Sequence, residues 1–285
     1  MATLSLSTLN TLKVTAFCVL TFFISGCGEK SQNTNVNTNT PPPLPLTELK
    51  NLDGKIKEMI KYEKFDEKNN CNIRTVDRRP YCANIKSILL SVEHGANFIY
   101  ASESGVYLDE RGEKEDCFVC HGGVKFFKFS LLEDNKLNLV NESEDFDCGP
   151  YGSVCDGITF QYGSGPEKGW IVQNTYLRRE YIVTDTKIYL PLEGKTIEAL
   201  QLQEVNESGA YQSDERRSEG ADEYTKVKLV TIPNPSQKFF DLKGTLDRVK
   251  QINGKEIRVS KTVTIKFDEK KLKYDTEQFK KLQTE

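Results

Sequence analysis

The stretch GTLDRVKQINGKEIRVSKTVTIKF, residues 244–267, decides the fold class of this chain. Apolar and polar side chains alternate from Ile257 to Phe267, which is typical of a β-strand with one buried face. A second strand-like segment covers residues 244–249, and Asn253-Gly254 lies between the two. Because Asn-Gly favours a two-residue type I′ turn, the stretch predicts an antiparallel β-hairpin.

Strand-like patterns recur along most of the chain, with turn residues about every ten positions. The segments are 88–92, 98–100, 124–129, 136–140, 157–162, 170–172, 180–183, 187–190 and 226–232. Many short strands with regular turns are typical of a β-sandwich or an open barrel. We therefore expect a mainly β fold with a helix at its N-terminal end.

That helix is predicted over residues 48–66, with Thr47 as its N-cap. Apolar side chains recur there at helical spacing, at Leu49, Leu52, Ile56, Met59 and Ile60. Met59 lies on this apolar stripe, which favours a position in the core. A short helix over residues 275–282 is expected to close the chain, and residues 205–222 are expected to form a long mobile loop.

The first residues have the anatomy of an export signal. Met1–Gly26 carries no acidic residue and one cation, and its apolar core, residues 14–24, is too short for a comfortable bilayer span. The signal ends in Ile24-Ser25-Gly26-Cys27, which resembles the lipobox of bacterial lipoproteins. The resemblance implies cleavage before Cys27 and attachment of diacylglycerol and palmitate-type chains there. The alternative is an ordinary signal peptide followed by an unmodified cysteine.

The resemblance also implies a location. Gly28 follows the lipidated cysteine, and in lipoproteins of double-membraned bacteria this favours the outer membrane. We expect a lipid-anchored protein of the cell envelope that faces the periplasm or the cell surface. Membrane contact through the lipid is thus the one partner predicted from sequence.

Three regions follow from these patterns. Residues 1–26 are the signal peptide, and residues 27–46 are the lipidated cysteine with a flexible tether rich in Asn, Thr and Pro. Residues 47–285 form a globular, β-rich body. A change of pattern near residue 124 allows a division of this body into an N-terminal mixed part and a C-terminal β part.

Composition excludes some classes of function. The formal net charge of -3 and the isoelectric point near 5.7 argue against a nucleic-acid partner. The chain has 2 histidines, so a metal site built from several histidines is not expected. The acidic residues and the serines follow no recognised catalytic pattern, and we expect no enzymatic activity.

Six cysteines follow Cys27, which in an exported protein indicates a disulfide framework. Cys71 and Cys82 bracket one short segment, and Cys148 and Cys155 bracket another. Both pairs are candidates for local disulfides that staple a loop. The spacing alone does not select among the possible pairings of six cysteines.

The middle pair lies in Cys117-Phe-Val-Cys120-His121, which resembles the haem-attachment motif of c-type cytochromes. The resemblance covers six residues, 117–122. It implies that Cys117 and Cys120 form thioethers with haem c and that His121 is the axial ligand of the iron, the one metal expected in the chain. His94 and Met59 are the candidates for the distal ligand.

Three functions remain open at this point. The first is an envelope lipoprotein that carries one covalent haem for electron transfer or sensing. The second is a non-enzymatic structural or interaction lipoprotein, with a β domain stapled by three disulfides. The third is a thiol–disulfide exchanger that uses the C-x-x-C, although the thioredoxin-like βαβ setting of such proteins is not seen in the sequence.

Overall fold

A computed structural model describes most of the predicted body. The described residues are 51–115, 120, 122–132, 135–148, 155–178, 181–207, 224–252 and 255–284. They belong to one compact unit, Thr40–Glu285. The predicted signal, the lipobox, the whole tether and the predicted N-cap Thr47 lie outside the described residues, as do Cys117 and His121.

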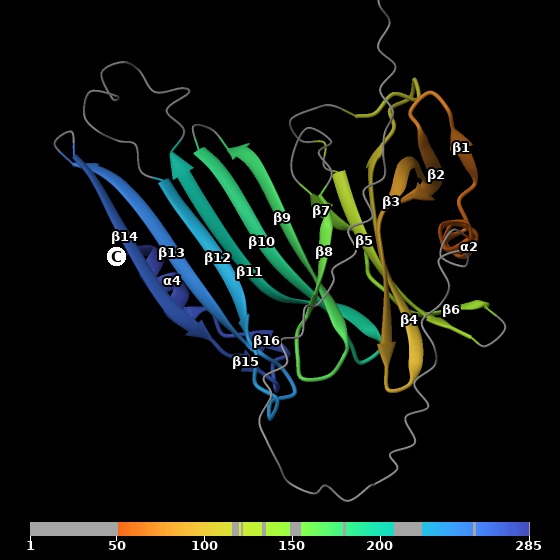
Figure 1. The fold of residues 1–285 in the computed structure, drawn as a ribbon. Helices are drawn as coiled ribbons and strands as arrows, with labels where there is room; N and C mark the ends of the chain where they lie inside the picture. The colour runs from red at the N-terminus through yellow and green to blue at the C-terminus, as the bar shows by residue number, and fades with distance from the viewer. Residues whose placement is uncertain are drawn as a thin grey trace, which may run out of the picture. The chain divides into compact units, whose positions relative to one another are not determined.

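The first sheet is antiparallel and contains seven strands (Figure 1). They are β1 (Lys64–Asp66), β2 (Cys71–Val76), β3 (Arg79–Glu93), β4 (Ala96–Tyr107), β5 (Gly122–Leu131), β6 (Leu137–Glu142) and β7 (Phe146–Cys148). The order is β1-β2-β3-β4-β5-β6. The short strand β7 pairs with the first residues of β5, and β6 pairs with the later residues of β5. The strands expected at 124–129 and 136–140 are confirmed as β5 and β6, which form an antiparallel pair.

Two further sheets follow in the chain. One has the order β11-β10-β9-β8, and the other has the order β12-β13-β14. Their strands are β8 (Gly157–Gln161), β9 (Lys168–Arg178), β10 (Tyr181–Leu192), β11 (Lys195–Glu207), β12 (Tyr224–Ile232), β13 (Asp241–Ile252) and β14 (Lys255–Ile265). The hairpin predicted at residues 244–267 is confirmed, because β13 and β14 pair from Leu242–Ile265 to Ile252–Lys255.

Two short strands and a helix complete the chain. They are β15 (Phe267–Asp268), β16 (Lys273–Tyr274) and α4 (Glu277–Thr284). The helix expected over 275–282 is therefore confirmed within two residues at each end. The loop expected over 205–222 does not include its first residues, because Val205 and Glu207 still belong to β11. The rest of that segment lies outside the described residues, apart from Asn206 in β11.

Both faces of the first sheet are covered. On one face, Leu52 and Ile56 of helix α2 (Leu52–Ile60) pack on Ile99, Phe127 and Phe129. On the other face, Phe126 of β5 stacks on Trp170 of β9, with 4.7 Å between the ring centroids. The second sheet thus packs face to face on the first. This arrangement confirms a mainly β fold with an N-terminal helix.

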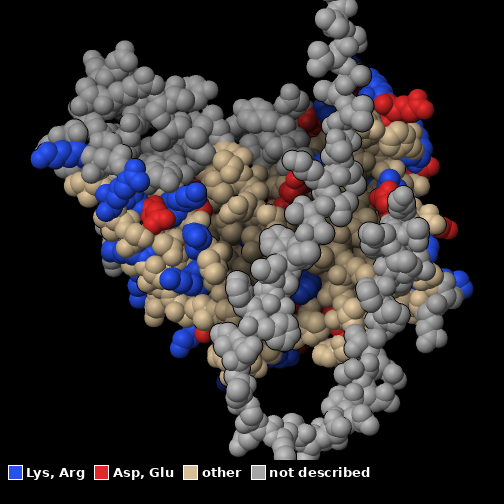
Figure 2. Space-filling model, viewed as in Figure 1, with Lys and Arg blue, Asp and Glu red and all other residues tan. Residues whose placement is uncertain are grey.

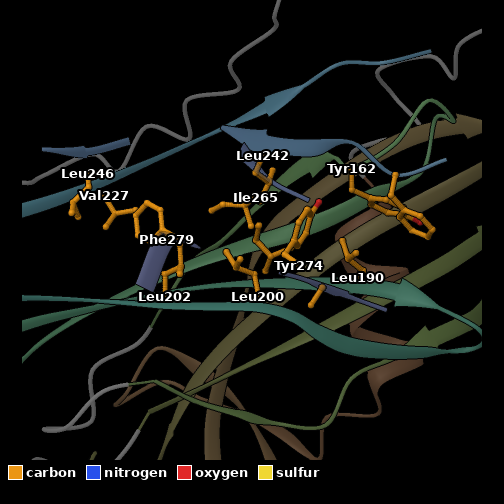
Figure 3. Close-up of a cluster of buried hydrophobic side chains, with 13 residues drawn as sticks. Tyr162, Leu190, Leu200, Leu202, Val227, Leu242, Leu246, Ile265, Tyr274 and Phe279 are labelled. Carbon is orange, nitrogen blue, oxygen red and sulfur yellow. The ribbon is translucent and has the colours of Figure 1, made fainter. Parts of the chain in front are cut away.

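A second core lies on the other side of β10 and β11 (Figure 3). Leu200 and Leu202 of β11 meet Leu242 and Leu246 of β13 there, and Phe279 of α4 is fully buried among them. A side chain at Gly244 would collide with Phe279 and Ile265 at under 3 Å. Glycine at this position therefore lets α4 lie against β13.

Helix α2 is shorter than predicted, and its apolar stripe is not fully covered. It ends at Ile60, because Lys61 adopts a left-handed conformation with φ of 62° and caps the helix. The backbone then enters β1. The prediction that Met59 lies in the core is wrong, since 37% of its surface is exposed.

Candidate functional site

The disulfides gather at one end of the first sheet. Cys82 of β3, Val106 of β4, Gly122 of β5 and Cys148 of β7 stand directly opposite one another on neighbouring strands. In antiparallel pairs, opposite residues point to the same face. One row of the sheet therefore joins the Cys82 position to the Cys148 position, and the start of β5, which follows the C-x-x-C-H motif, lies between them.

Two disulfides close this end. Cys71 pairs with Cys82 and Cys148 pairs with Cys155, with Cα–Cα distances of 5.5 and 5.7 Å. These are the two local pairs suggested by the spacing. All four cysteines are buried, and the first pair packs with Ile73, Val106 and Leu108. The first disulfide joins the paired strands β2 and β3, and the second joins the last residue of β7 to Cys155, two residues before β8.

Cys120 also takes part in a disulfide. It is half-buried and lies two residues before Gly122, the first residue of β5. The cysteine that pairs with Cys120 lies outside the described residues, and so do Cys117 and His121. Every cysteine that the structure describes is therefore oxidised, and three disulfides involve described residues at the same end of the sheet.

His94 is held at the opposite end of the same strands. It forms the β3–β4 turn with Gly95, with φ values of 50° and 83°, and its Nε2 lies 3.0 Å from Oε1 of Glu167. Asn97 and Val106, which pair with Leu131 and Gly122 of β5, are nine residues apart along β4. At roughly 3.4 Å per residue this is about 30 Å, so the structure does not bring His94 to the start of β5.

Met59 is placed elsewhere again. It lines a cavity of about 260 Å³ between α2, β2, β5 and β6. Phe127 and Phe129 line its apolar side, and Lys61, Arg74 and Lys125 contribute cations. Neither candidate for a distal haem ligand lies next to Gly122 in the described part of the chain. Thioether formation by Cys120 would also require its disulfide to open.

A second cavity of about 260 Å³ lies at the disulfide-rich end. It is lined by Cys82, Asn84, Lys86, Ser104, Gly105, Val106 and Lys114. Lys114 already donates a hydrogen bond of 3.0 Å to the carbonyl of Asn69. Among the described residues no group of three or more His, Cys, Asp or Glu side chains is arranged to hold a metal ion.

A buried charge network forms on the helix-covered face of the first sheet, and sequence reasoning missed it. Glu103 of β4 has a side chain that is 1% exposed and accepts two contacts of 2.8 Å from Arg74 of β2. Tyr62 donates a hydrogen bond to the same carboxylate, and Asp145 binds Arg74 from the other side. The guanidinium also lies over the Tyr81 ring, 4.7 Å from its centroid.

The network changes the acidity of its members. Burial and the adjacent Glu103 carboxylate both raise the pKa of Tyr62. Burial lowers the pKa of Arg74, but the Glu103 and Asp145 carboxylates outweigh it, and the pKa of the guanidinium is raised. Arg74 therefore remains charged, and Tyr62 remains a neutral donor. The network ties β2, β4 and the β6–β7 connection together across 71 residues of sequence.

A similar network lies between the two packed sheets. The Nζ of Lys128 lies 2.6 Å from Oε2 of Glu93, and both side chains are buried. Tyr100 donates to the other carboxylate oxygen, and its own oxygen accepts a hydrogen bond of 3.1 Å from the backbone of Lys168. The Lys128 ammonium and the Glu93 carboxylate pair with each other, and the carboxylate also accepts a hydrogen bond from Tyr100. Because the charges are paired in this way, a lysine and a glutamate can be buried in a β core.

Comparisons with known proteins give no relative. No protein-family model, curated protein sequence or solved structure matches this chain. Within the described residues, no helix has the length and apolar character needed to cross a bilayer.

Proposed function

We propose that this chain is a non-enzymatic interaction lipoprotein of the cell envelope, anchored through Cys27 and built on a β body that three disulfides stabilise. The observation that carries the proposal is the disulfide at Cys120, beside the Cys71–Cys82 and Cys148–Cys155 pairs. A cysteine held in a structural disulfide supplies neither a haem thioether nor a reactive thiolate. Under this proposal, the C-x-x-C forms a structural disulfide and His121 does not bind iron.

An attached haem c is the competing proposal. It is favoured by the Cys117–His121 motif and by the export signal, because haem is joined to such motifs outside the cytoplasm. In that case Cys117 and Cys120 hold the porphyrin and His121 binds the iron, and the protein transfers electrons or senses a ligand. The absence of a distal ligand beside Gly122, among the described residues, supports the interaction lipoprotein instead.

The two proposals predict different haem absorption and different numbers of reactive thiols in the purified protein. We expect the full chain, expressed in a host with active cytochrome c maturation and then denatured, to show no haem absorption band. Without reductant it should also show no reactive thiol, and Cys117→Ala should release one, at Cys120. A covalent haem band that His121→Ala weakens would overturn the interaction proposal and establish the haem protein.

The anchor is tested separately. We expect the wild-type chain to fractionate with membranes, and Cys27→Ser to lose acylation and the membrane association that depends on it. Intact mass of the detergent-extracted protein measures the added acyl chains directly. Cys18→Ser, which changes a cysteine within the signal, is the matched control and should remain acylated. An unmodified N-terminus in the wild-type protein would contradict the lipoprotein assignment.

A further inference from the structure

Charge is divided unequally along this chain. Residues 51–207 carry 19 Lys and Arg against 27 Asp and Glu, a net charge of -8. Residues 224–285, which form β12 to α4, carry 15 against 8, a net charge of +7. A nearly neutral total therefore conceals an acidic part and a basic part. Figure 2 shows Lys and Arg gathered over β12, β13 and β14.

The register of these strands places the cations on one face. Lys226 stands opposite Asp247, Lys228 opposite Thr245, and Lys243 opposite Val230 and Thr264. The residues between them, including Val227, Leu242 and Leu246, point into the core shared with α4. We call the outward set the basic face; it comprises Lys226, Lys228, Lys243, Thr245, Arg258, Ser260, Thr262 and Thr264.

The basic face is suited to a charged surface. Its lysines and Arg258 are exposed, and the side chains between them are mostly hydroxyls. The one large apolar side chain exposed with them is Val230. Protein interfaces normally need a buried apolar or aromatic centre, and single-stranded nucleic acids need aromatic rings for stacking. By register, this face also holds Tyr224 at the start of β12, Asp247 opposite Ser260, and Glu256 opposite Gln251. One aromatic residue at the end of the face provides neither an apolar centre nor a row of stacking rings, and the cations outnumber these two acidic residues.

We propose that the basic face lies against the anionic headgroups of the membrane that anchors the chain. The inference rests on the lipid anchor proposed above. Between Cys27 and Thr47 the tether has 19 residues, which span about 25 Å on average as a flexible chain. The body is therefore kept close to the bilayer, so even a weak attraction is effective. The acidic part, residues 51–207, is repelled by the same surface and turns away from it.

The test uses the mature chain from Gly28 onward, without acyl chains, so it does not depend on lipidation. We expect it to sediment with vesicles of phosphatidylcholine and phosphatidylglycerol, and not with vesicles of phosphatidylcholine alone. Because each cation near an anionic surface contributes about fivefold in partitioning, Lys228→Glu with Lys243→Glu should weaken binding by roughly 25-fold or more. Raising the salt to about 0.5 M should release the wild-type chain, since screening shortens the reach of the charges.

The matched control is Lys86→Glu with Lys195→Glu, which makes the same charge change at exposed lysines of the acidic part. It should bind within about twofold of the wild type, because these lysines lie outside the basic face. Equal weakening by both double variants would show that total charge matters and would overturn the proposal. No binding to anionic vesicles, or retention on immobilised nucleic acid without vesicle binding, would also overturn it. Loss of acylation in the full chain would contradict only the anchor.

Discussion

Arg74→Met should lower the free energy of unfolding by roughly 3–5 kcal/mol. The substitution keeps most of the side-chain length but removes the cation between Glu103 and Asp145. The Glu103 carboxylate, 1% exposed, is then left buried with Tyr62 as its hydrogen-bond donor. A buried charge without its partner costs far more than the pair itself contributes. Equilibrium denaturation in urea, followed by circular dichroism, measures the loss.

Arg79→Met is the matched control. Arg79 also covers a tyrosine ring, with its guanidinium 4.4 Å from the centroid of Tyr107, and it also pairs with a carboxylate, that of Glu115. Its side chain is 48% exposed, so the pair is solvated and its removal should cost less than about 1 kcal/mol. Equal losses in the two variants would show that stacking on tyrosine, and not the buried ion pair, accounts for the effect of Arg74.

The strands could be predicted because their signals are local. Alternation from Ile257 to Phe267 and the Asn-Gly pair before it specify the β13–β14 hairpin within a few residues. The short segments between Cys71 and Cys82 and between Cys148 and Cys155 likewise favour local pairing, as the structure shows. In these cases the contacts that decide the structure lie close together in sequence.

The charge networks could not be predicted, because they join distant segments. Glu103 is 29 residues from Arg74, and Asp145 is 71 residues from it. In sequence, Glu103 looks like an outward-facing side chain of a half-exposed strand. It is buried because β4 is covered by α2 on one face and by the second sheet on the other. The core position predicted for Met59 is wrong for a related reason. A helical pattern shows which side chains share a face, but not how much of that face the sheet covers.

The candidate haem site shows what a motif can and cannot specify. Cys117, Cys120 and His121 have the same spacing in a cytochrome and in a stapled loop, so spacing alone does not separate them. The structure adds that Cys120 is oxidised and that its end of β5 adjoins two other disulfides. The surroundings of the motif, and not the motif itself, favour the structural role.

Strong alkali should unfold this protein steeply, within about one to two pH units above pH 10. Tyr81, Tyr100, Tyr162, Tyr189 and Tyr274 are each at most 6% exposed, and burial raises the pKa of every one of them. Above pH 10 the unfolded chain loses these phenolic protons while the folded chain keeps them. The unfolded state then binds fewer protons, so stability falls as the pH rises.

The size of this effect follows from the number of groups. Each tyrosine that ionises only on unfolding removes about 1.4 kcal/mol per pH unit, so these five remove about 7 kcal/mol per pH unit, and Tyr62, whose pKa is also raised, adds to this. The loss over one pH unit is comparable to the total stability of a typical domain. Tyrosinate absorbance and circular dichroism should therefore change together. Tyr162→Phe removes one titrating group, and none of the described residues hydrogen-bonds its hydroxyl. It should lower the steepness of the pH dependence by about 1.4 kcal/mol per pH unit. Tyrosines that titrate one by one near pH 10 in a chain that keeps its native dichroism would contradict the burial on which the prediction depends.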